Sequence, residues 1–554
     1  MSNLKSIYFY FLAIQISLIK FFKKIYFTTN YYNQTLISKT PQQFYFHPNP
    51  FLLSAIKDYK KYSFRISEID PNIFWIKPKT SGEQKELHSF LWLSLIDRKN
   101  DGKSLQKLIS IWIMKNPKYK RNIWENSVLS KRIISWILNA DIILNNGYFE
   151  FRRNFLTKII IQANHLKRNI KFEKDYSSRI EVLTALLLTG LVFKEYEENY
   201  KIAINGLEKL LKEFFDQDGF PLTRNPSDLI FFTKYLILCK ECIQDAQKYI
   251  PEFLEEVINK SLNCIKEIIT PTDQVPLFNG AIEEDLEHLN KFIKELENKS
   301  KDNKKVTGGI KKMRFRNSQI FFDVGNPPKK DFSKSYQSGP LSFEYYLDGV
   351  KIITNCGFGC NISSKAELLS RLTSAQSTLT LNDTSVTKFE RNKLINNVFG
   401  NSIKNTFKVF DFNFEEDKTK VQTVASHNGY EKNYGCIFKR QLSIDKSTNN
   451  LLGYDEIIKN KDGKPLNYAL RFHLYPGISA VKTIGGKSVL IQLSKNKSLV
   501  LTVSEEILLL EKSIFLGGNK ILDNTCITIS GNLVNKNKSF NWEIKKTIDN
   551  ENKN

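Results

Sequence analysis

The sequence predicts a two-part chain, in which an N-terminal array of helices precedes an antiparallel β-sandwich. From Leu87 to about Leu296, apolar residues recur at the helical period. Residues 298–305 contain no apolar residue, which is typical of a solvated linker. Beyond them, short apolar runs alternate with turn dipeptides such as Asn428-Gly429 and Gly485-Gly486. Many short strands separated by such turns indicate a sandwich, so the fold class is α+β with the helices first.

Composition supports more than one hydrophobic core. A chain of 554 residues is too long for one ordinary core, and its 41% hydrophobic content disfavours disorder. The formal net charge of +24 would attract acidic polysaccharide, nucleic acid or an anionic membrane, unless the lysines are simply scattered over a solvated surface. No long Lys/Arg run or nucleic-acid module accompanies the charge, so nucleic-acid binding is not predicted.

Residues 1–40 form an apolar and basic N-terminal segment. The apolar run from Ile7 to Ile14 is followed by Lys20, Lys23 and Lys24. The run is short for a membrane span, and its charges follow it rather than precede it. Three interpretations stay open: an uncleaved export anchor, an amphipathic surface helix and an ordinary first helix. Membrane association through this segment is therefore one of the expectations.

The predicted helical domain covers residues 41–297, and two stripes illustrate its periodicity. The first comprises Leu183, Leu186, Leu187, Gly190 and Leu191, and the second Leu207, Leu210, Leu211, Phe214 and Phe215. Both follow the spacing i, i+3, i+4, i+7, i+8, which gives a helix one apolar side. Each helix then buries its stripe against its neighbours, as in a stacked array.

The predicted sandwich covers residues 306–548 and is organised around a hairpin. Apolar residues alternate with polar ones from Leu341 to Leu347, which predicts a strand with Glu344 on an outward polar face. Asp348-Gly349 suits a tight turn, and the returning strand runs from Val350 to Thr354. A further strand is expected from Arg371 to Leu381.

The sequence of this region resembles that of the C-terminal sandwich in the heparinase II/III family of polysaccharide lyases. The resemblance lies in Leu341-Ser342-Phe343-Glu344, then Asn355-Cys356-Gly357, then the stretch from Arg371 to Thr378, in that order. In the helical part, Trp124, Arg132-Ile133 and Trp136 resemble a helix that recurs in the family. The resemblance implies that the helical domain is an incomplete α/α toroid.

The resemblance also implies β-elimination at a uronic acid. In that reaction a base removes the C5 proton, a second group neutralises the carboxylate, and an acid protonates the departing O4. Ser177-Ser178 stand where the family has Asn-His, and Asp228-Leu229 where it often has Tyr-His. Gln337 and Gln376 stand where it has His, and Asn355 where it often has Asp. Because zinc prefers imidazole and carboxylate ligands, no metal and no other cofactor are predicted.

Eight residues are the candidates for the site. The catalytic candidates are His427 as base, Tyr430 as acid, and Asn225; the substrate-binding candidates are Arg224, Arg371, Gln337, Gln376 and Arg440. Arginine can hold a carboxylate through two parallel hydrogen bonds, and amides can bind sugar hydroxyls.

Each candidate also has a structural interpretation. Asn225 is a favourable helix cap before Pro226. His427 and Tyr430 can be satisfied hydrogen-bonding groups inside the sandwich, and Arg371 can pair with Glu344.

Two functions follow. The first is a lyase-like enzyme acting on an acidic polysaccharide. The alternative is a catalytically degenerate glycan-binding protein that assists export or maturation of cell-surface polysaccharide. The expected location is the cell envelope or periplasm, with the cytoplasm as the alternative.

Overall fold

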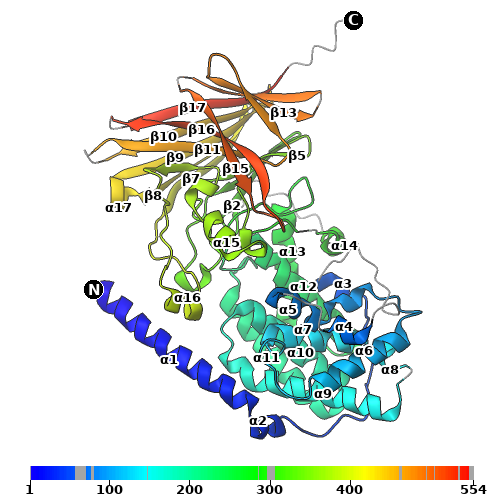
Figure 1. Ribbon diagram of the computed structural model, residues 1–554. Coiled ribbons are helices and arrows are strands. Elements are labelled where there is room, and N and C mark those ends of the chain that lie inside the picture. The colour runs from blue at the N-terminus through cyan, green and yellow to red at the C-terminus, as the bar shows by residue number, and fades with distance from the viewer. Residues whose placement is uncertain are drawn as a thin grey trace, which may run out of the picture. The chain divides into compact units, whose positions relative to one another are not determined.

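The computed structural model divides the chain into two compact units (Figure 1). The helical unit comprises Met1–Phe215 with Phe231–Lys260, and the sheet unit comprises Asp216–Ile230 with Ser261–Asn554. The structure describes residues 2–56, 70–75, 80–145, 147–284, 286–295, 306–460, 464–494, 496–504, 506–534 and 537–547. Helices come first along the chain and strands second, as predicted. The linker predicted at 298–305 lies outside the described residues, and the domain limits drawn around it stay a prediction.

The helices up to residue 268 belong to the helical unit or link it to the other. They are α1 Ser2–Thr28, α2 Asn30–Thr35, α3 Leu52–Ile56, α4 Pro71–Phe74, α5 Ser81–Ser89, α6 Gly102–Lys115, α7 Asn126–Leu138, α8 Ala140–Leu144, α9 Phe149–Asn169, α10 Tyr176–Val192, α11 Glu197–Phe214, α12 Pro226–Asp245 and α13 Glu252–Ile268. Both predicted stripes are buried, one on α10 and the other mainly on α11.

Helix α10 is the centre of the helical unit. It packs against α7, α9 and α11, and its residues from Ile180 to Val192 are all buried, so it has no solvent side. Gly190 is required at the contact with α11, because a Cβ atom there would collide with the backbone of Tyr200. The sequence predicted one apolar stripe for this helix, whereas the structure buries its whole circumference.

A buried arginine links α7 to its surroundings. Arg132 donates to Gln162 Oε1 at 2.6 Å, His88 O at 2.9 Å and Ile123 O at 3.0 Å. Its guanidinium also lies 4.6 Å from the ring centroid of Trp112. Burial lowers the pKa of Arg132 to about 9. The arginine of the Trp…Arg-Ile…Trp motif thus bonds three other segments of the helical unit to α7.

The sheet unit contains two antiparallel sheets. The nine-stranded sheet has the order β1-β2-β3-β4-β5-β11-β16-β15, with β6 pairing β11, and the eight-stranded sheet has the order β12-β13-β14-β17-β10-β9-β8-β7. The strands are β1 Val306–Thr307, β2 Ile310–Phe315, β3 Ser318–Asp323, β4 Phe343–Leu347, β5 Val350–Thr354, β6 Leu379–Leu381, β7 Val409–Glu416, β8 Lys420–Tyr430, β9 Cys436–Asp445, β10 Leu451–Lys459, β11 Leu466–Leu474, β12 Ser479–Lys482, β13 Ser488–Ser494, β14 Lys497–Val503, β15 Leu508–Phe515, β16 Leu522–Leu533 and β17 Asn537–Lys546. Its further helices are α14 Glu287–Glu295, α15 Ser364–Ser370, α16 Lys393–Phe399 and α17 Glu431–Tyr434.

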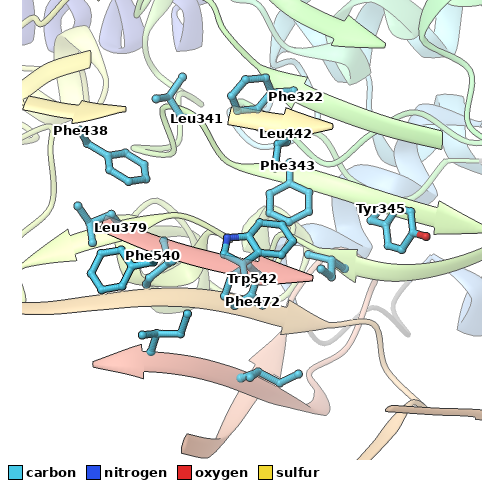
Figure 2. Packing of buried hydrophobic residues seen from close by; sticks show 14 of the residues in the cluster. Phe322, Leu341, Phe343, Tyr345, Leu379, Phe438, Leu442, Phe472, Phe540 and Trp542 are labelled. Atoms are coloured by element: carbon cyan, nitrogen blue, oxygen red, sulfur yellow. The ribbon is translucent and has the colours of Figure 1, made fainter. Parts of the chain in front are cut away.

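The hydrophobic core of the sheet unit draws on both sheets (Figure 2). Trp542 of β17 stacks on Phe343 of β4 at a centroid distance of 5.8 Å, and meets Phe472 of β11 edge-on at 5.0 Å. Gly453 pairs with Trp542 across β10 and β17, and a Cβ atom there would meet the indole ring. The two sheets therefore form a sandwich around an aromatic centre.

The predicted hairpin is confirmed as β4 and β5. Asp348 and Gly349 have φ values of 52° and 77°, as expected for the type I′ turn that such a dipeptide favours. The outward polar face was wrong, since every residue of β4 is buried. Within the sheet unit, Leu277 and Phe278 lie against this side of the strand, where Leu277 N donates to Glu344 and Phe278 clusters with Tyr346.

The strand predicted from Arg371 to Leu381 is mostly wrong. Helix α15 ends at Ser370, a short 3₁₀ turn follows at Thr373–Ala375, and only Leu379–Leu381 is a strand. The hydroxyl of Thr373 donates to Ser338 O at 2.6 Å, so this polar side chain bonds the backbone of another segment. Such side-chain to backbone bonds replace a strand ladder.

Candidate functional site

Along β11, the nine-stranded sheet has one apolar side and one polar side. Leu470, Phe472 and Leu474 of β11 enter the core. Arg471 and His473 therefore face the opposite way, because successive side chains of a strand alternate. We call this side the polar face; it carries Asp323, Glu344, Tyr346, Arg471, His473, Glu511 and Thr528. These are the charged and hydrogen-bonding groups from which a site in the sheet unit would be built.

Glu344 is the most enclosed carboxylate of the polar face. It forms an ion pair with Lys351 at 3.0 Å, and both side chains are buried. It also accepts hydrogen bonds from Tyr346 Oη at 2.8 Å and Thr354 Oγ1 at 3.0 Å. The proposed pairing of Glu344 with Arg371 was therefore wrong. The hairpin register places Tyr346 opposite Lys351, which brings this lysine rather than a distant arginine to the carboxylate.

Arg224 and Asn225 occupy structural positions in the sheet unit. Arg224 forms an ion pair with Asp323 and donates to Asn326 O at 2.8 Å and Gly308 O at 3.1 Å. Asn225 is buried, and its Oδ1 accepts from Ser227 N at 2.9 Å at the start of α12, so the capping interpretation is confirmed. Their contact with a substrate stays a prediction.

Gln337, Gln376 and Asn355 stand where the family has His or Asp. All three side chains are buried and hydrogen-bonded to the backbone. Gln337 Nε2 donates to Ser370 O at 2.8 Å, and its Oε1 accepts from Gly280 N at 2.9 Å. Gln376 Nε2 donates to the same Ser370 oxygen at 2.8 Å. Asn355 Oδ1 accepts from Ser377 N at 2.9 Å. The structure thus brings Gln337 and Gln376 together, around a backbone carbonyl.

His427 and Tyr430 are neighbours inside the sandwich, with ring centroids 5.7 Å apart. His427 is 0% exposed, and its Nδ1 accepts from Gly429 N at 3.1 Å. Burial, with a smaller effect of Arg440, lowers the pKa of His427 to about 3, so the ring is neutral at physiological pH. The Tyr430 hydroxyl donates to Leu379 O at 2.9 Å, and burial raises its pKa.

Arg440, on β9 of the eight-stranded sheet, bonds segments that precede two strands of the nine-stranded sheet. It forms an ion pair with Asp455 at 2.7 Å on the neighbouring strand and donates to Leu341 O and Ser377 O, each at 2.8 Å. Trp542 Nε1 donates to the same aspartate at 2.8 Å. All of these hydrogen bonds are internal to the sheet unit.

Arg371 holds loops of the sheet unit together. It donates to Asn401 O at 2.7 Å, Tyr336 O at 2.8 Å and Ser333 O at 2.9 Å. The side chain is fully buried, and burial lowers its pKa to about 10. The role of Arg371 in this structure is therefore to satisfy three backbone carbonyls.

His473 is a further buried histidine, on the polar face. Its Nε2 lies 3.0 Å from Ser374 O, and its Nδ1 lies 3.0 Å from Ser513 Oγ and 3.7 Å from Cys356 Sγ. Burial lowers the pKa of His473 to about 4 and raises that of Cys356 to about 12. Both groups are thus neutral at physiological pH, which is the opposite of an activated thiolate and imidazolium pair.

An open groove of about 320 Å³ lies on the polar face, beside Arg471. Arg471 Nη1 donates to Thr380 Oγ1 at 2.5 Å, and its Nη2 is 3.9 Å from Asp383. On the far side of the groove, Glu511 accepts from Thr528 Oγ1 at 2.7 Å. Sequence reasoning missed this groove. Alternation along β11 singles out Arg471, but strands β15 and β16 become its neighbours only in the sheet.

Comparisons with known proteins give a family match for the C-terminal domain and the fold of the chain. Residues 299–543 match the family model described as "Heparinase II/III-like, C-terminal". A crystal structure of heparinase III superposes with a TM-score of 0.67 at 14% identity, covering 91% of this chain and 85% of that one. A mutant of the heparan sulfate lyase HepC from Pedobacter heparinus gives 0.62 at 15% identity, covering 85% and 77%. The predicted toroid followed by a sandwich is confirmed.

A curated relative is similar in sequence. The FtsZ-localized protein C of Caulobacter vibrioides is 24% identical over 429 residues, which cover 73% of this chain and 72% of the relative. The similarity thus extends over helices and sheets alike.

Proposed function

We propose that this chain, whose C-terminal domain belongs to the heparinase II/III-like family, binds acidic polysaccharide without cleaving it. One observation carries the proposal. The side chains at the sandwich positions that match the lyase motifs are buried, and the amides among them bond groups inside the protein. Gln337, Gln376 and Asn355 bond backbone groups, and His427 is sealed in the sandwich. The glycan-binding alternative is therefore favoured over the lyase.

Elimination needs a base that reaches the C5 proton of the sugar. A general base acts within hydrogen-bonding distance of the proton that it removes, or through one water molecule. The neutral ring of His427 has the protonation state of a base, but it is 0% exposed. The hydroxyl of Tyr430, the candidate acid, already donates to Leu379 O at 2.9 Å. Neither group meets a polymer on the surface in this conformation.

Arg471 is the cationic side chain in the lining of the groove, together with the carboxylates of Asp383 and Glu511, and it could bind one carboxylate of a glycan. A guanidinium binds a carboxylate through two parallel hydrogen bonds. Thr380 and Thr528 have hydroxyl groups, and Asp383 and Glu511 have acceptor oxygens, which match sugar hydroxyls. The net charge of +24 would concentrate a polyanion near the protein before the groove selects it.

The name of one relative concerns location rather than chemistry. Its name, FtsZ-localized protein C, records where that protein is found and no reaction. For the present chain we propose a location in the cell envelope, because acidic polysaccharides occur there. Cell fractionation tests this location, and recovery in the cytosolic fraction alone would contradict it.

The proposal is tested by measuring binding and cleavage on the same polymers. Heparan sulfate, chondroitin, alginate and a bacterial acidic polysaccharide are titrated by calorimetry, while absorbance follows unsaturated uronate. We expect binding of at least one polymer and no absorbance change. Replacing Arg471 by glutamine should weaken binding about tenfold, because a hydrogen bond to a charged group contributes about 1.5 kcal/mol or more.

The matched control is Arg314→Gln, which removes an exposed arginine from β2 of the same sheet. It changes the net charge equally and should leave binding close to that of the unmodified chain. Equal losses in the two variants would mean that charge alone, and not the groove, attracts the polymer. Unsaturated uronate that accumulates with the unmodified chain and is lost in Tyr430→Phe would establish the lyase. Absence of binding to every polymer would refute the proposal.

A further inference from the structure

Helix α1 carries a continuous apolar stripe that faces solvent. Its members are Ile7, Phe11, Ile14, Leu18, Phe22 and Ile25. At 3.6 residues per turn, these side chains fall within about 80° of the helix circumference. All but Ile14 are between 51% and 65% exposed. A surface helix normally turns such a stripe toward a core, so this one lacks the usual cover.

The other side of α1 holds it to the helical unit. Lys23 lies 2.9 Å from the ring centroid of Phe172. Phe27, one turn further on, contacts Tyr32 and His165 at centroid distances of 4.7 and 5.1 Å. Because Lys23 and Phe27 lie on nearly the opposite side of the helix from the stripe, the helical unit leaves the stripe uncovered.

The charge around the stripe is uniformly positive. The first 57 residues contain no Asp or Glu, and α1 contains Lys20, Lys23 and Lys24. These lysines lie away from the stripe, about 120° to 160° around the helix from its centre. An apolar side rich in Phe, Leu and Ile with lysines opposite is the pattern of helices that lie in a membrane interface.

We propose that α1 binds the surface of an anionic lipid bilayer, lying in its plane with the stripe immersed among the acyl chains. No helix within the described residues is both long and apolar enough to cross a membrane. Lys20 and Lys24 would extend their long side chains toward the lipid phosphates. The helical unit, which holds α1 through Lys23 and Phe27, would stay in water. This inference is independent of the polysaccharide proposal.

A second copy of the chain is the competing occupant. The spacing of four and three residues along the stripe would also suit a coiled-coil seam. In such a dimer, however, two helices that contain lysines and no Asp or Glu would lie side by side without acidic partners. Charge complementarity therefore favours anionic lipid.

The test measures cosedimentation of the full chain with vesicles of phosphatidylglycerol and phosphatidylcholine, or of phosphatidylcholine alone. We expect stronger binding to the anionic vesicles, weakened by salt. Phe11→Glu and Phe22→Glu should each lower the partition coefficient about tenfold or more, because each removes a large immersed side chain. Lys20→Gln and Lys24→Gln should each lower it about fivefold on anionic vesicles only.

The matched control is Phe149→Glu in α9, which changes a still more exposed aromatic residue, 81% exposed, elsewhere in the helical unit. It should bind vesicles like the unmodified chain. The changed side chains of α1 are exposed, so circular dichroism should show unaltered folding in every variant. Absence of binding to anionic vesicles would overturn the inference, as would equal losses for Phe149→Glu. A dimer that dissociates in Phe11→Glu, without vesicle binding, would assign the stripe to a second copy.

Discussion

His427 of β8 gives the most direct test that the interior of the sandwich is closed to solvent. Its pKa is about 3 in the folded chain and about 6.5 in an unfolded one. Because the folded pKa is lowered, the unfolded state binds the proton more readily. The contribution to stability is therefore complete above about pH 6.5 and is lost as the pH falls toward about 3. Lowering the pH from about 8 to about 5 should therefore lower the free energy of unfolding by about 2 kcal/mol through His427 alone.

The perturbation is His427→Gln, which keeps a hydrogen-bond acceptor and removes the titrating ring. Hydrogen exchange of the β8 and β9 amides reports the free energy of opening at each pH. The difference between the unmodified chain and the variant cancels the carboxylates and other groups common to both. We expect any advantage of the unmodified chain at about pH 8 to shrink by about 2 kcal/mol at about pH 5.

Phe438→Leu provides the control, because Phe438 contacts the His427 ring at a centroid distance of 5.6 Å and does not titrate. Its destabilisation should be the same at each pH. A difference for His427→Gln that does not change between about pH 8 and pH 5 would refute the reasoning. It would mean that the imidazole titrates normally, and a solvated imidazole would again be a candidate base.

Two substitutions test other parts of the packing. Arg371→Gln removes the charged donor from three buried carbonyls and should lower the free energy of unfolding by about 3 kcal/mol or more, measured by chemical denaturation; a loss below about 0.5 kcal/mol would contradict this role. Gly190→Ala would press a Cβ atom onto the backbone of Tyr200 and should cost about 1 to 3 kcal/mol, seen as a lower melting temperature. Gly82→Ala, where the nearest atom lies at 4.0 Å, is its control, and equal shifts would argue against the close contact.

Much of the fold could be predicted because its signals are local. The hairpin turn at Asp348-Gly349 depends on two adjacent residues that tolerate positive φ, and both residues have positive φ in the structure. The second stripe, centred on α11, lies within nine consecutive residues and is buried as expected. The segment after Arg371 was predicted wrongly, because the bonds that set its path join it to the loop at Ser338.

The sequence by itself determined the order of helices and sheets, the hairpin and the absence of the usual lyase side chains. Those features depend on residue type and short-range periodicity, which a sequence states directly. Only the tertiary structure decided what the remaining polar residues do. Gln337 accepts from Gly280, 57 residues away, and Arg440 donates to Leu341, 99 residues away. A buried polar group is satisfied by whichever donor or acceptor the fold brings beside it, so its role cannot be predicted before those distant partners are known.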